Sequence, residues 1–364
     1  MVGGQVKTIE SELNPPFALF RKGILIFIAY EYIGGMDVEI KKNVSLADYS
    51  VFKIGGPAKF FAAVKSEDDL VEALKFSKER GLPIFILGAG SNILVSDKGF
   101  GGLVIKMDLQ DLHYAGGGKL VVGSGVSMAR VVNESIKAGL GGFEWGIGIP
   151  GTIGGSIRGN AGCFGSEMKD VVERVRVLQF PISNFQFPKR PQTSYFSEQP
   201  LELLNKDCQF SYRGSIFKKR PGWIIVSAVL SLSKGDKVES QKKILDYTTH
   251  RSQTQDIGAK SAGCIFKNIP WEDVRNKQVL LKEFTDLQQF LNRPTLPASY
   301  LIDQVGLKGK TIGNVYVSSK HANYIVNKGG GKAEEVMMLI ALIKERVHTK
   351  YNIFLEEEIQ LVGF

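Results

Sequence analysis

Two dense clusters of glycine constrain this chain most strongly. Many of its 41 glycines fall in residues 84–95 (IFILGAGSNILV) and 146–165 (GIGIPGTIGGSIRGNAGCFG). Glycine lets the backbone approach a ligand closely, and successive N–H groups in such turns bind anions. Either cluster alone could equally be a set of turns in a β-rich fold. Two clusters in one domain predict a site for a large phosphorylated cofactor.

The first cluster follows an apolar strand expected at residues 83–87. It departs from the dinucleotide fingerprint G-x-G-x-x-G because Ile93 holds the third glycine position and a strand, not a helix, is expected next. The candidate cofactor-binding residues in this cluster are Gly88, Ala89, Gly90, Ser91 and Asn92.

The second cluster contains a formal G-x-G-x-x-G at residues 146, 148 and 151, but no strand leads into it and Pro150 interrupts it. We therefore reject the dinucleotide fingerprint here. Residues 150–152 are expected to open a short helix whose first amides face a pyrophosphate, with small residues after them that keep this helix close to a flat ligand. The candidates in this cluster are Gly151, Thr152, Gly154, Gly155, Asn160 and Gly165.

Charge and cysteine content narrow the class of protein. The chain carries 46 basic and 37 acidic residues, for a net charge of +9. The lysines are spread along the chain, so the charge favours phosphorylated small molecules over nucleic acid. Three cysteines without metal-ligand spacing argue against a metal site and a disulfide framework, and favour a reducing cytoplasm.

The apolar run at 23–34 is too short to span a bilayer and is a weak signal-peptide candidate.

Periodicity predicts an α+β fold with many short strands. The residues before 37 look like a dispensable extension, and residues 187–200 are expected to form a Pro- and Ser-rich loop. Helices are expected at 68–80, 128–138, 238–251 and 333–347. Strands are expected at 50–64 (strand, turn, strand), 83–87, 171–180, 223–232 and 353–362.

Eight sequence blocks, in order from about residue 43 to the end, resemble the UDP-N-acetylenolpyruvoylglucosamine reductase family. The blocks are FKIGGPA (52–58), LGAGSNILVSDKGFGGLVI (87–105), GIPGTIGGSIRGNAGCFG (148–165), CQFSYRGSIFK (208–218), SAGCIFKN (261–268), LIDQVGLKGKTIGN (301–314), HANYIVN (321–327) and FLEEEIQLVG (354–363).

The resemblance implies a two-part FAD-binding domain of the para-cresol methylhydroxylase and vanillyl-alcohol oxidase type, followed by a smaller α+β substrate-binding domain. We expect these domains at 37–234 and 235–364, after an extension at 1–36. It also implies the reaction: NADPH reduces the flavin, hydride passes to the enolpyruvyl ether of UDP-N-acetylglucosamine, and a protein acid protonates the neighbouring carbon. No nucleic acid, membrane insertion or obligate protein partner is expected.

Three catalytic roles can be carried over on matching positions. Arg213 matches the arginine that contacts the substrate carboxylate, a task suited to a forked, permanently charged guanidinium. Outside this family block, an arginine at a turn would be expected to be an exposed surface residue. Glu358 matches the catalytic glutamate, although strand alternation alone places Glu356 on the same polar face and makes it the main alternative.

Cys264 departs from the family pattern, in which a serine donates the proton in a G-S-x-F-K-N string. A thiol is a stronger acid and can fill the same role if the site keeps it protonated. The alternative is a buried cysteine that acts as a small hydrophobic residue. Tyr212, Lys267 and Asn268 are the expected substrate-binding residues.

Several features stay open at this stage. Arg158 could pair with a cofactor phosphate or form a structural ion pair, and the loop at 180–200 carries no assignable role. His250 and His321 are expected to be structural. Two rival functions remain: an FAD-linked oxidase or dehydrogenase of the same fold that needs no NADPH, and a sugar-nucleotide-binding protein that has lost catalysis.

Overall fold

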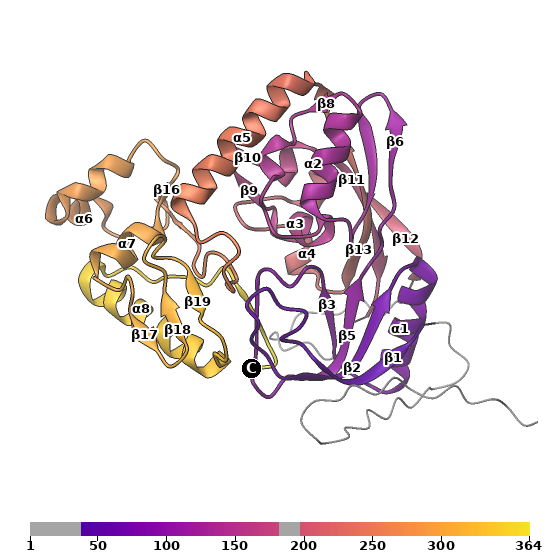
Figure 1. The fold of residues 1–364 in the computed structure, drawn as a ribbon, viewed down its shortest axis with the longest axis horizontal. Coiled ribbons are helices and arrows are strands. Elements are labelled where there is room, and N and C mark those ends of the chain that lie inside the picture. The colour runs from indigo at the N-terminus through magenta and orange to yellow at the C-terminus, as the bar shows by residue number, and fades with distance from the viewer. Residues whose placement is uncertain (1–37, 182–196) are drawn as a thin grey trace, which may run out of the picture.

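The computed structural model describes residues 38–181 and 197–364 (Figure 1). The expected extension at 1–36 and most of the expected loop at 187–200 lie outside the described residues. Within the described ranges, no helix is both long and apolar enough to cross a bilayer.

The first sheet has the strand order β1-β2-β5-β3, with β1 antiparallel and the other neighbours parallel. Helix α1 (Glu67–Glu79) packs against it and begins at a capping box, in which the Ser66 hydroxyl accepts from the Asp69 N–H at 3.0 Å. The strands are β1 (Ile40–Ser45), β2 (Pro57–Val64), β3 (Ile84–Leu87) and β5 (Phe100–Met107).

The strand expected at the start of 50–64 is wrong, because residues 51 and 52 form a turn and β2 pairs with β1 instead. Phe52 is fully buried, in the same core cluster as the C-terminal residues. The amide of Asn327 donates to the Phe52 carbonyl at 3.0 Å. These long-range contacts hold the segment in a turn, and a local alternation of apolar residues does not reveal them.

The second sheet is antiparallel, with the order β12-β11-β13-β7-β6. The expected loop is too long at its end, because residues 197–200 belong to β12. That strand lies at the sheet edge, where a proline such as Pro200 is tolerated. The strands are β6 (Leu112–Gly116), β7 (Lys119–Gly123), β11 (Val172–Gln179), β12 (Ser197–Leu204) and β13 (Trp223–Ser231).

Helices α2 (Met128–Lys137), α3 (Ile153–Gly159) and α4 (Ile216–Lys219) accompany the second sheet, and α5 (Lys237–Thr254) runs from it toward the C-terminal part (Figure 1). The two sheets share a buried cluster that joins Leu103 and Ile105 to Leu178 and Ile224. This shared core fixes how the sheets face each other, and therefore fixes the space between them.

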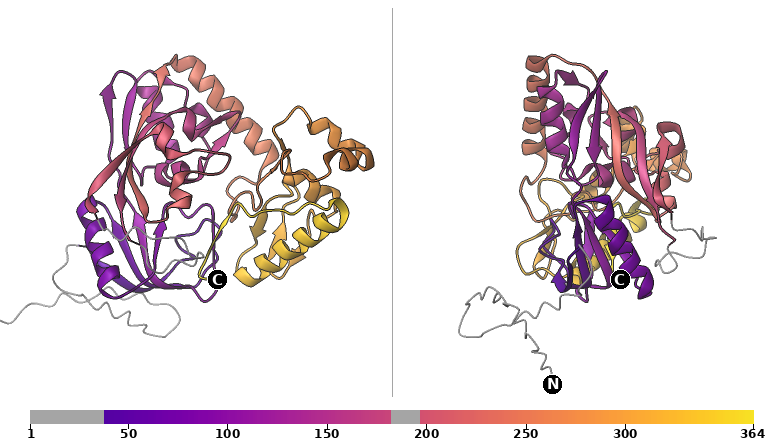
Figure 2. Two further views of the ribbon diagram at one scale, coloured as in Figure 1. Left: turned by 180° about the vertical axis from the view of Figure 1, so that it is seen from behind. Right: turned by 90° about the vertical axis from the view of Figure 1, so that its right-hand side faces the viewer.

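The C-terminal part lies beside the two sheets (Figure 1; Figure 2, left). Its core includes the buried face of α8 and its three-stranded sheet has the order β17-β18-β19. The elements are α6 (Lys277–Glu283), α7 (Ala298–Gln304), α8 (Ala333–Tyr351), β17 (Thr311–Ile312), β18 (Val315–Val317) and β19 (Ile325–Asn327).

The chain then returns to the first domain. The strand expected at 353–362 is shorter than predicted, since β20 (Gln360–Val362) pairs in parallel with β4 (Ile93–Val95) and only an isolated bridge at Glu357 precedes it. Residues 353–359 instead pack against the C-terminal core through Ile353, Leu355 and Ile359. The segment that carries residue 358 therefore links the two parts of the protein.

Candidate functional site

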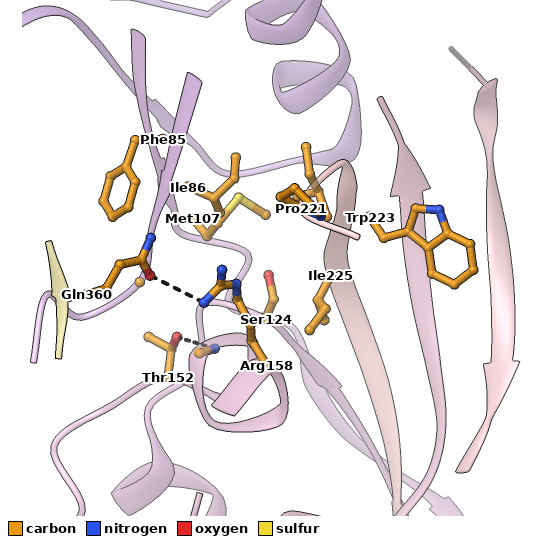
Figure 3. Close-up of a pocket in the computed structure, with 14 residues that line it drawn as sticks. Phe85, Ile86, Met107, Ser124, Thr152, Arg158, Pro221, Trp223, Ile225 and Gln360 are labelled. Atoms are coloured by element: carbon orange, nitrogen blue, oxygen red, sulfur yellow. Dashed lines mark hydrogen bonds between the residues drawn. The ribbon is translucent and has the colours of Figure 1, made fainter. Parts of the chain in front are cut away.

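A cavity lies where the two sheets meet α3 (Figure 3). The space inside it, open solvent included, is about 660 Å³. The lining comes from four separate parts of the chain: Phe85, Ile86, Gly88 and Met107; Ser124, Thr152, Gly154, Gly155 and Arg158; Pro221, Trp223, Ile224 and Ile225; and Gln360.

Both glycine clusters contribute to this cavity. Thr152 caps α3 by accepting from the Gly155 N–H at 3.4 Å, and a Cβ on Gly88 would lie 2.7 Å from the Thr152 hydroxyl oxygen. A Cβ on Gly154 would lie 2.8 Å from that of Ser124. The buried Ser124 hydroxyl has no hydrogen-bond partner among the described residues. Close backbone packing and a polar group free for a ligand suit a phosphorylated cofactor such as FAD.

Other predicted cofactor residues lie outside the cavity lining. Gly90 is buried with a φ of +67°, and a Cβ there would lie 1.9 Å from the Tyr49 carbonyl oxygen. Ala89 is exposed and Ser91 is half-buried. The amide of Asn92 donates to the backbone carbonyl of residue 358 at 3.2 Å. This end of the first cluster thus holds the returning C-terminal segment.

Asn160 is fully buried and supports the protein itself. Its side-chain amide donates to Glu167 at 2.7 Å and to the Ser211 carbonyl at 2.9 Å, and its oxygen accepts from the Lys169 N–H at 3.0 Å. Gly165, with a φ of +84°, turns the hairpin of β9 (Gly162–Cys163) and β10 (Ser166–Glu167). The Gly151 carbonyl accepts from the N–H of residue 128 at 3.0 Å.

The three predicted catalytic residues do converge. The Ile265 carbonyl accepts from the Glu358 N–H at 2.8 Å, so the segment with Cys264 runs beside the returning segment. Cys264 itself bridges to Tyr324 on its other side. Arg213 reaches the same place from the second sheet's domain, with its Nε 2.8 Å from the Glu358 Oε1.

Arg213 stands in a constrained turn. Its φ is +51°, and its guanidinium also donates to the Gly162 carbonyl at 3.2 Å. Burial acts to lower the pKa of this guanidinium, but the surrounding acidic groups, Glu358 first and then Tyr212 and Cys264, together outweigh that effect and the pKa is raised. Both side chains are mostly buried, at 24% and 17% exposure, so this pair is shielded from solvent.

The environment keeps Cys264 protonated. Burial and the Glu358 carboxylate raise the pKa of the partly buried thiol from 9.0 to about 12, against the opposing pull of Arg213 and Arg251. At neutral pH the group is therefore a thiol that can give up a proton, and not a thiolate nucleophile.

Comparisons with known proteins agree with this geometry. Residues 254–362 match the model of the UDP-N-acetylenolpyruvoylglucosamine reductase C-terminal domain, and residues 58–181 match an FAD binding domain. UDP-N-acetylenolpyruvoylglucosamine reductase of Caldanaerobacter subterraneus is 35% identical over 88% of this chain and 93% of its own length. That of Alkaliphilus oremlandii is 35% identical over 87% and 91%. The chain belongs to the UDP-N-acetylenolpyruvoylglucosamine reductase family.

The crystal structure of the Thermus caldophilus reductase superposes with a TM-score of 0.67 at 29% identity, and covers 90% of this chain and 100% of that one. The predicted fold class is confirmed: an FAD-binding domain followed by a C-terminal domain of this family. FAD is the cofactor that the domain match indicates. The cavity between the sheets is the candidate site for it.

The predicted substrate-binding residues border the catalytic group. The Tyr212 hydroxyl accepts from the Asn268 N–H at 3.2 Å, and the Asn268 amide oxygen accepts from the Ala298 N–H at 3.2 Å. Lys267 pairs with Glu356, whose side chain is 74% exposed. Among the two glutamates considered from the sequence, only Glu358 contacts Arg213.

Sequence reasoning missed Lys218, which stands in the same block as Arg213. Its ammonium donates to the Arg213 carbonyl at 2.6 Å. Burial, then the nearby Arg158 and Lys267, lower the pKa of Lys218 to about 8. The sequence block that contains both Lys218 and Arg213 was the one signal that could have indicated this lysine. Only the fold shows that cations from separate segments lie close to it.

The two histidines named from the sequence take no part in the catalytic group. The His250 ring meets the ring of Phe164 at 5.6 Å. The His321 ring packs on Tyr324 at 4.5 Å, and burial lowers the pKa of this histidine. Neither residue contacts Arg213, Cys264 or Glu358 through a hydrogen bond or ion pair in the described part of the chain.

Proposed function

We propose that this protein reduces UDP-N-acetylglucosamine enolpyruvate to UDP-N-acetylmuramate with NADPH as reductant, in the cytoplasm, as a step in the supply of peptidoglycan precursors. The observation that carries the proposal is the convergence of Arg213, Cys264 and Glu358 beside an FAD-binding domain. The named activity of the family relatives supports the same reaction.

The reaction saturates a carbon–carbon double bond by adding a hydride and a proton. FAD held in the cavity that Thr152 and Gly155 help to line would supply the hydride. Arg213 binds the substrate carboxylate and stabilises the negative charge that develops on it as hydride arrives. Cys264 donates its proton to the other carbon of the double bond, which completes the saturated ether.

Glu358 has two roles in this proposal. Its carboxylate holds the Arg213 guanidinium at 2.8 Å, and its charge helps to keep the Cys264 thiol protonated until the proton is needed. Tyr212, Lys267 and Asn268 border this group and are proposed to bind the substrate.

A second cleft supports a nucleotide substrate. It lies in the C-terminal part and is lined by Arg293, Lys320 and His321 among others. Its lining also holds Lys308, which is paired with Asp303 at 2.6 Å. The His321 ring packs on Tyr324, the residue that bridges to Cys264. We propose that the UDP moiety binds here, where Arg293 and Lys320 supply positive charge for its phosphates.

The test uses the purified protein without oxygen. We expect flavin absorbance that bleaches with NADPH and returns promptly when UDP-N-acetylglucosamine enolpyruvate is added. A yellow protein indifferent to NADPH would indicate an oxidase of the same fold. A protein that bleaches but ignores the substrate would indicate a binding protein without catalysis.

A further inference from the structure

Arg158 is the one charged residue among the described residues that line the cavity between the sheets. Helix α3 carries it, and its side chain points into the cavity (Figure 3). The rest of the lining is apolar or neutral, with no aspartate or glutamate. The cavity therefore holds a positive charge without a negative one.

The contacts of Arg158 leave that charge uncompensated. Its guanidinium donates to the neutral Gln360 amide oxygen at 3.3 Å. No carboxylate pairs with it among the described residues. Burial lowers the pKa of this guanidinium, which marks the charged form as poorly solvated. A charge left in this state is costly unless an anion joins it.

We propose that Arg158 provides the counter-charge for the phosphate groups of the bound dinucleotide. The inference rests on the assignment of FAD to this cavity. A guanidinium suits phosphate because its fork donates two parallel hydrogen bonds and keeps its charge at all working pH values. The capped start of α3, with Thr152 and Gly155, lies in the same lining.

Gln360, which accepts a hydrogen bond from Arg158, connects the cofactor cavity to the catalytic group. Gln360 stands two residues after Glu358, and its N–H donates to the Asn92 carbonyl at 3.0 Å. Arg158 thus joins the cofactor cavity to the segment that positions Glu358.

The test compares apoprotein binding of FAD, which has two phosphates, with riboflavin, which has none, by flavin fluorescence. We expect Arg158→Gln to weaken FAD binding about 10- to 100-fold and to leave riboflavin binding unchanged. Arg158→Lys keeps the charge but loses the fork, so its FAD affinity falls between the two. Arg346→Gln, an exposed arginine on α8, is the matched control and should bind like the wild type.

Equal losses for FAD and riboflavin would overturn the proposal, because they would place Arg158 at the flavin ring or in the fold. Unchanged FAD binding would overturn it too. If Arg158→Gln does not fold, wild-type FAD affinity measured against increasing KCl decides: it should fall with salt while riboflavin affinity does not, and no salt dependence would refute the role. A wild-type protein that binds no FAD would instead refute the proposed function.

Discussion

The protonated state of Cys264 gives a quantitative prediction about its reactivity. Alkylating reagents react with the thiolate. At pH 8 a thiol with the ordinary pKa of 9.0 is about one-tenth thiolate, whereas a pKa of about 12 leaves about one molecule in ten thousand. Because a thiolate of higher pKa is also the better nucleophile, Cys264 should react with iodoacetamide roughly 30- to 1,000-fold more slowly than a free cysteine, before any further slowing by burial.

The carboxylate of Glu358 contributes to the raised pKa of Cys264, so its removal should change the rate at which Cys264 is alkylated. Glu358→Gln deletes a charge that raises the thiol pKa and leaves the opposing Arg213 and Arg251 in place. We expect faster alkylation of Cys264 in this variant at pH 8. Cys208, also raised to a pKa of about 12 but by burial and Asp207, should react at the same rate in both proteins.

The assay is timed labelling at several pH values, followed by peptide mass spectrometry that separates the three cysteines. The inflection for wild-type Cys264 should lie far above pH 9, and that of Glu358→Gln should lie lower. An inflection at or below pH 9 in the wild type would refute the raised pKa. One below about pH 7 would also leave the residue largely thiolate at neutral pH, and a thiolate cannot serve as the proton donor.

Three further predictions follow from the same geometry. Lys218, whose pKa is lowered to about 8, loses its charge as the pH rises through 8, so kcat/KM for the anionic substrate should fall above that pH. The Lys218→Arg variant should not show this fall, and a pH profile equal to that of the wild type would contradict the assignment. Gly88→Ala places a Cβ 2.7 Å from the Thr152 hydroxyl and should weaken FAD retention, whereas Gly101→Ala, which meets nothing within 4 Å, should not; equal retention would refute the close packing. Asn160→Ala leaves buried groups unpaired and should lower the free energy of unfolding by about 1–3 kcal/mol in denaturant titrations, while no loss would show that its hydrogen bonds are dispensable.

Much of the fold could be predicted because its signals are local. Helix α8 follows from apolar spacing, and the glycine clusters mark the turns that approach the cavity. The roles expected at Arg213, Cys264 and Glu358 came from the family blocks, and the structure brings these residues together. Periodicity alone would not have separated Glu358 from Glu356.

Long-range contacts explain what the sequence could not reveal. Phe52 leaves its expected strand because its partners lie some 270 residues away, in the C-terminal core. Asn160 looked like a cofactor ligand because it stands in a glycine-rich block, yet its hydrogen bonds hold the protein's own hairpin. The lowered pKa values of Lys218 and Arg158 result from their surroundings in the fold, which include other segments of the chain. The spacing of residues along the sequence does not reveal these surroundings.

The central claim is that a thiol on residue 264 completes the reduction. Single-turnover reoxidation tests it: protein reduced in advance with NADPH is mixed anaerobically with the enolpyruvyl substrate, and the return of flavin absorbance is timed. We predict that Cys264→Ala bleaches normally but recovers its colour about 100- to 10,000-fold more slowly, while Cys264→Ser retains measurable recovery. Recovery of Cys264→Ala at the wild-type rate would contradict the account.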